Sequence, residues 1–224
     1  MAVVHMTPKG KRQSILFIDG DAVGPVLNSD MLFLNIHEDD NLNEDKLTEV
    51  LQQYILPAGQ KKALDLLLAE DRTESELQRR LIQAGYGGSV VASIMEYVKQ
   101  FPYLNDVRYA LNYMHSLGKK KSMLEIRHKL SEKGVSEDDF EKALEQYREE
   151  RQDSSEDSGV CLSEEDMELE TVRGLLHKKV VPGTALTRTQ KEKLYASFLR
   201  KGFGYHTVRQ ALKEYPTDEE SDEI

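Results

Sequence analysis

ELQRRLIQAGYGGSVVASIMEYV, residues 76–98, is the first of three similar stretches, and EIRHKLSEKGVSEDDFEKALEQY (125–147) and KLYASFLRKGFGYHTVRQALKEY (193–215) follow it. Each stretch has one glycine to which the other two can be aligned. Apolar residues then stand eight and four positions before the glycine, and one and six positions after it. The three glycines are Gly85, Gly134 and Gly202.

This spacing predicts two helices joined by a glycine turn. Apolar residues at i and i+4 place one buried face on the helix before the glycine. Glycine ends that helix because it adopts the left-handed backbone conformation at low cost. The apolar residue after it can pack over the helix end, and the apolar positions that follow make the inner face of a second helix.

A further helix is predicted before each pair, over 58–70, 104–118 and 166–179, where leucines and other apolar residues recur at helical spacing. The expected fold is therefore mostly α, with three tandem three-helix repeats in an elongated array. We place repeat 1 at 58–101, repeat 2 at 102–148 and repeat 3 at 171–215. A single unit cannot bury its apolar face, so neighbouring repeats must cover it.

The charge is distributed unevenly along the chain. Residues 171–213 hold ten basic residues and one acidic residue, whereas residues 149–170 hold ten acidic residues and one basic residue. We interpret 149–170 as a solvated acidic insertion that leads into repeat 3, although residues 148–153 could instead extend the preceding helix. The acidic tail, 216–224, is expected to be disordered over its last eight residues, TDEESDEI.

Residues 1–57 have a different pattern, with short apolar runs at 14–18, 22–27 and 31–36. Asp19-Gly20 between two such runs is typical of a β-hairpin. A helix capped by Asn43 or Asp45 should follow, and Pro57 should stop it. We therefore expect a small β-rich segment with one helix before the repeats.

Several classes of protein are disfavoured. Cys161 is the only cysteine, which excludes an internal disulfide and is typical of a reducing, cytoplasmic setting. No run approaches the ~20 apolar residues of a membrane span. No phosphate-binding glycine motif, zinc motif or nucleophile elbow occurs, and the six histidines have no metal-ligand spacing. We expect no enzyme activity, metal or cofactor, and a monomer because no surplus apolar stripe is evident.

Residues 61–116 resemble the RecX family. The matching elements are Ala63-Leu64, Glu74-Ser75-Glu76-Leu77 with Arg79-Arg80-Leu81, Gly85-Tyr86, and Tyr103-Leu104-Asn105-Asp106-Val107-Arg108-Tyr109-Ala110. The last element is the most specific. Asn105 stands where the family commonly has aspartate, the family's basic element appears as Gly118-Lys119-Lys120-Lys121, and the acidic insertion is long for the family.

The resemblance implies a partner and a function. RecX-like proteins bind the filament of the RecA recombinase on DNA, lie in its groove and suppress its activities. They thereby modulate recombinational DNA repair and the SOS response. A direct nucleic-acid-binding protein that acts without the recombinase is the alternative, since a basic segment attracts polyanions. A helical scaffold for another partner is a third reading.

We expect the binding surface to use basic residues that lie off the apolar faces, together with the lysine cluster before the middle helix of repeat 2. A solvated helix face is the better explanation of any single lysine, but ten basic residues in repeat 3 exceed what one acidic residue can neutralise. The candidate partner- and DNA-binding residues are Arg79, Arg80, Lys119, Lys120, Lys121, Arg127, Lys129, Lys191, Lys193, Arg200 and Lys201.

Overall fold

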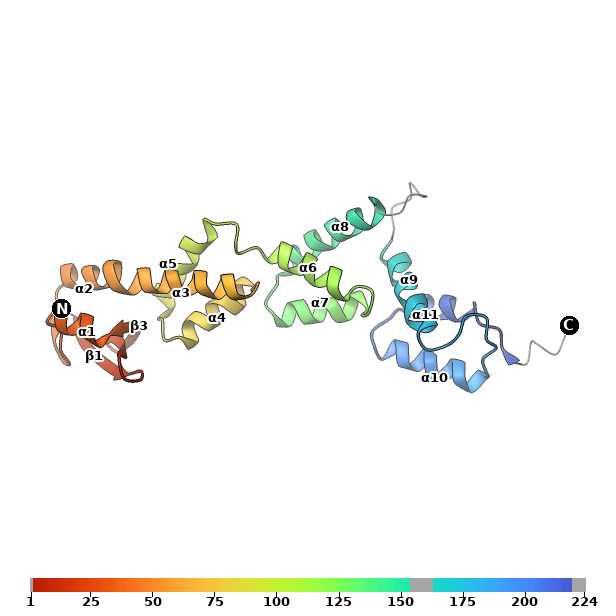
Figure 1. The fold of residues 1–224 in the computed structure, drawn as a ribbon, viewed down its shortest axis with the longest axis horizontal. Helices are drawn as coiled ribbons and strands as arrows, with labels where there is room; N and C mark the ends of the chain where they lie inside the picture. Colours follow the sequence, from red (N-terminus) through yellow and green to blue (C-terminus); the bar gives the residue numbers. More distant parts are fainter. Residues whose placement is uncertain (1, 154–162, 219–224) are drawn as a thin grey trace. The chain divides into compact units, whose positions relative to one another are not determined.

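The computed structural model describes residues 2–153 and 163–218 (Figure 1). It is mostly helical, with a small antiparallel sheet near the N-terminus, as predicted. The chain divides into two compact units, Met1–Asn105 and Asp106–Ile224. The β-rich segment and repeat 1 therefore share the first unit.

The sheet of the first unit has the strand order β3-β2-β1-β4. Its strands are β1 (Ala2–Pro8), β2 (Gln13–Ile18), β3 (Asp21–Leu27) and β4 (Asn41–Leu42). Asp19 and Gly20 form the two-residue turn between β2 and β3, both with positive φ, so the predicted hairpin is confirmed. Strand β1 was not predicted, because the apolar residues of AVVHMTP do not alternate regularly with polar ones.

Two predictions for residues 31–57 need correction. Residues 31–33, in the third apolar run, belong to the short helix α1 (Asn28–Phe33) and not to a strand. Asn43 caps α2 (Glu44–Val50) as expected, but Pro57 does not end the helix. The chain continues through the π-helix η1 (Leu51–Ile55) into α3 (Leu56–Ala69), where Pro57 lies in the first turn. Proline is tolerated in the first turn of an α-helix, where its fixed φ already suits the helix.

Repeat 1 consists of α3, α4 (Glu74–Gln83) and α5 (Gly88–Lys99). Gly85 ends α4 with φ +95°, and the N–H of Tyr86 donates to the carbonyl oxygen of Leu81 at 3.2 Å. This is the predicted glycine turn in its Schellman form. The buried side chains of the sheet, such as Leu16, and of the helices, such as Leu77 and Ile94, form one core.

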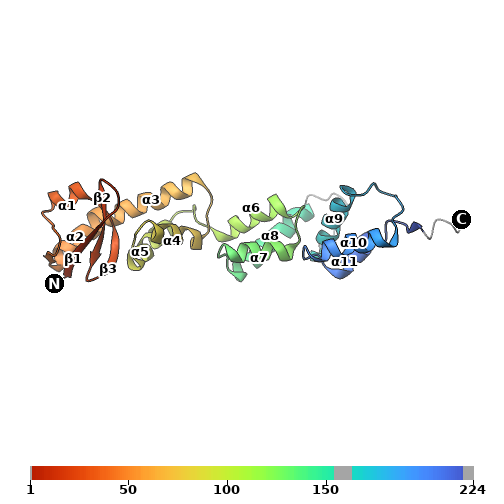
Figure 2. The same ribbon diagram turned by 90° about the horizontal axis from the view of Figure 1, so that it is seen from below.

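The second unit holds the other two helix triplets (Figure 2). One consists of α6 (Asp106–Leu117), α7 (Met123–Glu132) and α8 (Glu137–Asp153), and the other of α9 (Glu164–His177), α10 (Arg188–Leu199) and α11 (Tyr205–Leu212). Gly134 and Gly202 have φ +87° and +80°, and the N–H groups of Val135 and Phe203 repeat the bond seen at Tyr86. The glycine-turn prediction holds in all three triplets.

The acidic insertion is shorter than expected in the described part of the chain. Helix α8 runs to Asp153, so residues 148–153 extend the helix and are not a linker. Arg148 and Arg151 hold this end to α9 through Glu164 and Glu170. Residues 154–162, with Cys161, lie outside the described residues. In the tail, Thr217 bridges to Leu186, which corrects the expectation of disorder at its start.

Candidate partner and nucleic-acid interface

The basic residues of repeat 3 are incompletely neutralised. Arg173 pairs with Glu214, and Arg188 pairs with Glu192. Seven others have no carboxylate within ion-pair distance in the described part of the chain, and they are Lys178, Lys179, Lys193, Arg200, Lys201, Arg209 and Lys213. Lys191 donates instead to the hydroxyl of Thr217 at 2.7 Å. The surface therefore keeps a strong positive charge that can attract a polyanion.

The predicted residues of repeat 2 fall into two groups. Lys121 pairs with Glu125, and Lys129 pairs with Glu132 at 2.8 Å. The hydrogen bond that Lys129 donates to Glu132, and then the negative charge of Glu132, raise the pKa of Lys129. By contrast, Lys119 and Lys120 have no carboxylate partner among the described residues. Exposed ion pairs are weak enough to exchange partners, so pairing alone does not remove Lys121 or Lys129 from a binding surface.

Arg127 has a different environment. Its guanidinium pairs with Glu137 and Glu141 of α8 and lies 4.4 Å from the centre of the Phe140 ring. Cation–π contact and a two-carboxylate clamp both fix this side chain between α7 and α8. The geometry therefore favours a structural role for Arg127 over partner contact.

A groove joins repeats 2 and 3 and brings three of the predicted residues together. It has a volume of about 570 Å³ and is lined by Leu124, Glu125, His128, Lys129, Arg200, Lys201 and Gly202. The Leu124 side chain is 62% exposed at its edge. A groove with several cations beside an exposed apolar residue can take an acidic chain that also carries an apolar side chain.

The walls of this groove are held by direct contacts between the repeats. The hydroxyl of Ser122 donates to the carbonyl oxygen of Lys201 at 2.7 Å. The buried hydroxyl of Thr171 donates to the carbonyl oxygen of Gly118 at 3.0 Å. We refer below to the groove lined by Lys129, Arg200 and Lys201 as the inter-repeat groove.

A model of the RecX second three-helix domain matches residues 105–144, which cover α6, α7 and the start of α8. The chain is 24% identical over 217 residues to regulatory protein RecX of Clostridium botulinum (strain Alaska E43 / Type E3), covering 94% of this chain and 93% of that protein. It is 28% identical over 166 residues to regulatory protein RecX of Vibrio cholerae (strain M66-2), covering 74% and 99%. The chain therefore resembles the RecX family over most of its length.

Solved RecX structures share the fold. A crystal structure of regulatory protein RecX aligns with a TM-score of 0.57 at 18% identity, over 95% of this chain and all of that one. RecX from Lactobacillus salivarius aligns with a TM-score of 0.55 at 22% identity, over 71% of this chain and 95% of that one. At these identities the likeness concerns the fold.

The RecX domain match covers Lys119, Lys120, Lys121, Arg127 and Lys129, whereas the remaining predicted residues lie outside it. Arg79 and Arg80 are exposed on α4 of the first unit, with no carboxylate partner among the described residues. Lys191, Lys193, Arg200 and Lys201 belong to repeat 3 of the second unit. The described part of this chain has no group of three or more histidine, cysteine or acidic residues placed to hold a metal ion, and no helix able to cross a membrane.

A second cavity in repeat 3 was missed by the sequence analysis. It measures about 390 Å³ and is lined by Lys191, Glu192, Tyr195, Tyr205, Arg209, Leu212 and Lys213. The rings of Tyr195 and Tyr205 meet edge to face, with centres 5.4 Å apart, and Tyr205 is 54% exposed. Burial, and then the neighbouring Tyr205, raise the pKa of Tyr195.

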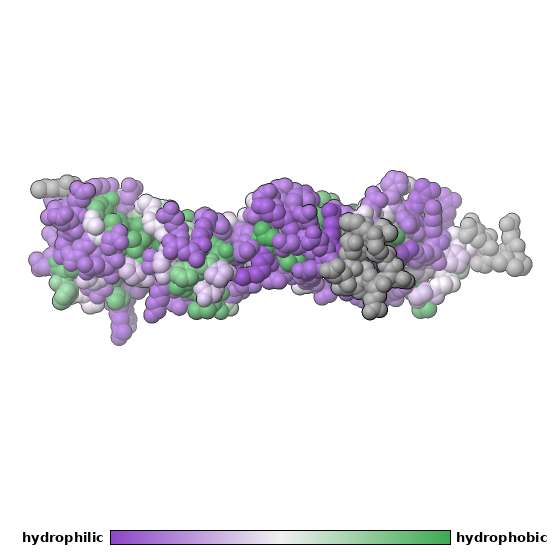
Figure 3. All heavy atoms as spheres, turned by 90° about the horizontal axis from the view of Figure 1, so that it is seen from above, coloured by the Kyte–Doolittle hydropathy of each residue, from purple (hydrophilic) through white to green (hydrophobic). Residues whose placement is uncertain are grey.

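The spacing of aromatic and basic residues in repeat 3 could have predicted this cavity. Tyr205, Arg209 and Lys213 follow one another at i, i+4 and i+8, and Lys191 and Tyr195 at i and i+4. Residues at these spacings share a helix face, so aromatic and cationic side chains alternate along two neighbouring helices. Figure 3 shows that hydrophilic residues dominate the face drawn, with patches of hydrophobic surface between them.

Proposed function

We propose that this protein is a negative modulator of the RecA recombinase. It binds the RecA–DNA filament by surface contact, without catalysing a reaction itself, and so regulates recombinational repair and the SOS response. The proposal is supported by the relatives, which are named regulatory protein RecX and match 94% and 74% of this chain. The observation that carries it is the inter-repeat groove, where Arg200 and Lys201 have no carboxylate partner among the described residues.

The groove has the chemistry that such a partner requires. A filament of protein on DNA presents acidic side chains and phosphates, which attract an uncompensated basic surface. Leu124 adds an exposed apolar contact at the same place. Because repeats 2 and 3 are tied by the Ser122–Lys201 hydrogen bond, the cations are held in one arrangement before binding, which reduces the entropy lost on association.

The test is the DNA-dependent ATPase of the cognate recombinase on single-stranded DNA, titrated with this protein. The parent should inhibit at amounts below the recombinase concentration. A double variant, Arg200→Glu with Lys201→Glu, should require at least tenfold more protein. Lys11→Glu with Arg12→Glu is the matched control, because it reverses the same two charges in the turn after β1. Absence of inhibition by the parent at excess would refute the proposal, and equal inhibition by the groove variant would refute the groove.

A second candidate function is direct binding of single-stranded nucleic acid, which the Tyr195–Tyr205 cavity favours. Bases stack on exposed aromatic rings while lysine and arginine contact the phosphates. Affinity for an oligonucleotide, measured by fluorescence anisotropy without recombinase, should fall steeply with salt. Tyr205→Ala should weaken it about tenfold or more and Tyr205→Phe little, since stacking contributes ~1–3 kcal/mol per base. An affinity that is independent of salt and of Tyr205 would exclude this function.

A further inference from the structure

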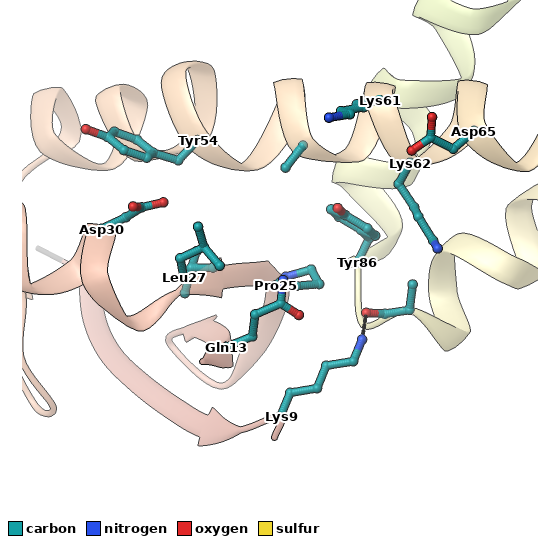
Figure 4. A pocket seen from close by; sticks show the side chains of 13 residues that line it. Lys9, Gln13, Pro25, Leu27, Asp30, Tyr54, Lys61, Lys62, Asp65 and Tyr86 are labelled. Atoms are coloured by element: carbon teal, nitrogen blue, oxygen red, sulfur yellow. Dashed lines mark hydrogen bonds between the residues drawn. The ribbon is translucent and has the colours of Figure 1, made fainter. Parts of the chain in front are cut away.

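A cleft in the first unit lies between the sheet and α3, away from every residue assigned above. It measures about 470 Å³, within the range of small-molecule sites. Figure 4 shows its walls, with β3 on one side and η1 and α3 on the other. Its lining residues are Lys9, Gln13, Pro25, Val26, Leu27, Asp30, Tyr54, Ala58, Lys61, Lys62, Asp65, Ala84 and Tyr86.

Tyr86 is the centre of the cleft. A Cβ atom at Gly24 of β3 or Gly59 of α3 would come within 3.1 Å of its ring, so both glycines make room for it. The side chain is only 6% exposed, yet its hydroxyl has no hydrogen-bond partner among the described residues and points into the cleft (Figure 4). Burial raises the pKa of Tyr86, so the hydroxyl remains protonated and can donate. A hydroxyl that opens into the cleft and has no protein partner is available to bond a ligand or a water molecule.

The two ends of the cleft differ in charge. Figure 4 shows Lys9, Lys61 and Lys62 with a single carboxylate, Asp65, at the end where Tyr86 lies, and Asp30 beside Tyr54 at the other end. Lys9 donates to the carbonyl oxygen of Ala84, which leaves donors of its ammonium group for a ligand. Lys62 has no carboxylate within ion-pair distance in the described part of the chain.

Between the two ends the lining is apolar or aromatic. Pro25, Leu27 and Ala58 line this part, together with the ring of Tyr54. Tyr54 belongs to η1, and π-helical turns frequently occur at functional sites because they re-aim a side chain. A ligand that fills the cleft therefore needs an anionic end, a flat apolar middle and a hydrogen-bond donor at its far end.

We propose that this cleft binds a nucleoside phosphate. The phosphate lies at Lys9, Lys62 and the Tyr86 hydroxyl, where two ammonium groups and one O–H can donate to its oxygens. The base lies against Tyr54 and Leu27, and its exocyclic amino group donates to the Asp30 carboxylate. This site is separate from the inter-repeat groove and does not depend on the function proposed for it.

The test is isothermal titration calorimetry of the full chain with ADP, and with adenosine and inorganic phosphate as its fragments. ADP should bind one per chain and at least tenfold more tightly than either fragment. Lys62→Ala and Tyr86→Phe should each weaken ADP about tenfold, the loss expected for one hydrogen bond to a charged group. Asp30→Asn should weaken ADP but leave phosphate binding unchanged.

Two controls separate binding from folding. Tyr86→Phe keeps the buried ring, so its thermal midpoint should match that of the parent, and Lys119→Ala removes a lysine of the second unit and should leave ADP binding unchanged. No binding of ADP at millimolar concentration would overturn the proposal. An ADP affinity that is unchanged in both the Lys62→Ala and the Tyr86→Phe variant would also overturn it. Binding of hexaglutamate without binding of ADP would identify an acidic-peptide site and equally overturn it.

Discussion

Ser122 and Lys201 stand 79 positions apart in the chain, and the Ser122 hydroxyl donates to the Lys201 carbonyl oxygen at 2.7 Å. The same hydroxyl accepts from the N–H of Glu125 at 3.2 Å and so caps α7. One buried serine therefore begins a helix of repeat 2 and fastens the end of α10 in repeat 3 to it. This contact places Arg200 and Lys201 beside Lys129.

Ser122→Ala should lower the free energy of unfolding by about 2 kcal/mol, because it removes a helix cap and a tertiary hydrogen bond together. Ser163→Ala is the matched control. Ser163 caps α9 by accepting from the N–H of Asp166, and it makes no tertiary hydrogen bond to the residues that the structure describes, so about 1 kcal/mol is expected. Urea denaturation followed by circular dichroism measures both. Equal losses would show that the Ser122–Lys201 bond contributes nothing.

Gly87→Ala should destabilise the first unit by about 3 kcal/mol or more. A Cβ atom at Gly87 would overlap the backbone carbonyl oxygen of Ala22, and the N–H of Gly87 bonds to the carbonyl oxygen of Val23 at 3.1 Å. Gly88 is the neighbouring control, because nothing lies within 4 Å of a Cβ atom there. Gly88→Ala should leave thermal stability unchanged or raise it. Similar melting curves for both variants would contradict this close approach of α5 to β3.

Arg127→Ala should lower stability by about 1–2 kcal/mol through loss of its clamp on Glu137, Glu141 and the Phe140 ring. Lys142→Ala removes an exposed ion pair with Asp138 on the same helix, α8, and should change stability little. After correction for the folded fraction, inhibition of the recombinase by Arg127→Ala should match the parent. A loss of inhibition without a loss of stability would instead make Arg127 a contact residue.

The pKa of Asp166 should lie below that of an ordinary aspartate. The hydroxyl of Ser163 and then its backbone N–H donate to this carboxylate and lower its pKa. A depressed carboxyl pKa contributes stability above the unfolded-state value and loses that contribution as the pH falls through the folded-state value.

An NMR titration of the carboxyl carbon tests this shift, and Ser163→Ala should return the midpoint toward the usual value of about 3.9. A midpoint in the parent at the ordinary value would show that the capping box of α9 does not form in solution.

The periodic parts of the fold were predictable from the sequence. The glycine-centred pattern gave the turns at Gly85, Gly134 and Gly202, because an apolar face and a left-handed glycine are local requirements that leave a local trace. Asp19-Gly20 gave a hairpin for the same reason. The prediction that Pro57 ends the helix was wrong. Whether a proline ends a helix depends on the turn that precedes it, and the π-helical turn η1 has no evident sequence signal.

The candidate binding residues were predictable as a charge excess but not as sites. An uncompensated count of ten basic residues against one acidic residue indicated a basic surface in repeat 3. It could not show that Arg127 is clamped while Arg200 has no carboxylate partner in the described chain. The carboxylates that pair with a basic side chain can lie several turns or a whole helix away in the sequence. Amino-acid composition does not show which of them come close.

The sequence by itself determined the helical repeats, the glycine turns, the hairpin and the RecX-like elements, since each depends on residues within a few positions of one another. The tertiary structure alone decided the inter-repeat groove, the tyrosine cavity of repeat 3 and the cleft around Tyr86. The groove and the cavities depend on contacts between separate helices and strands, such as Ser122 with Lys201 and Gly87 with Val23, which form only when these elements pack. Packing geometry is set by the shapes of both partners at once, so no single segment encodes it.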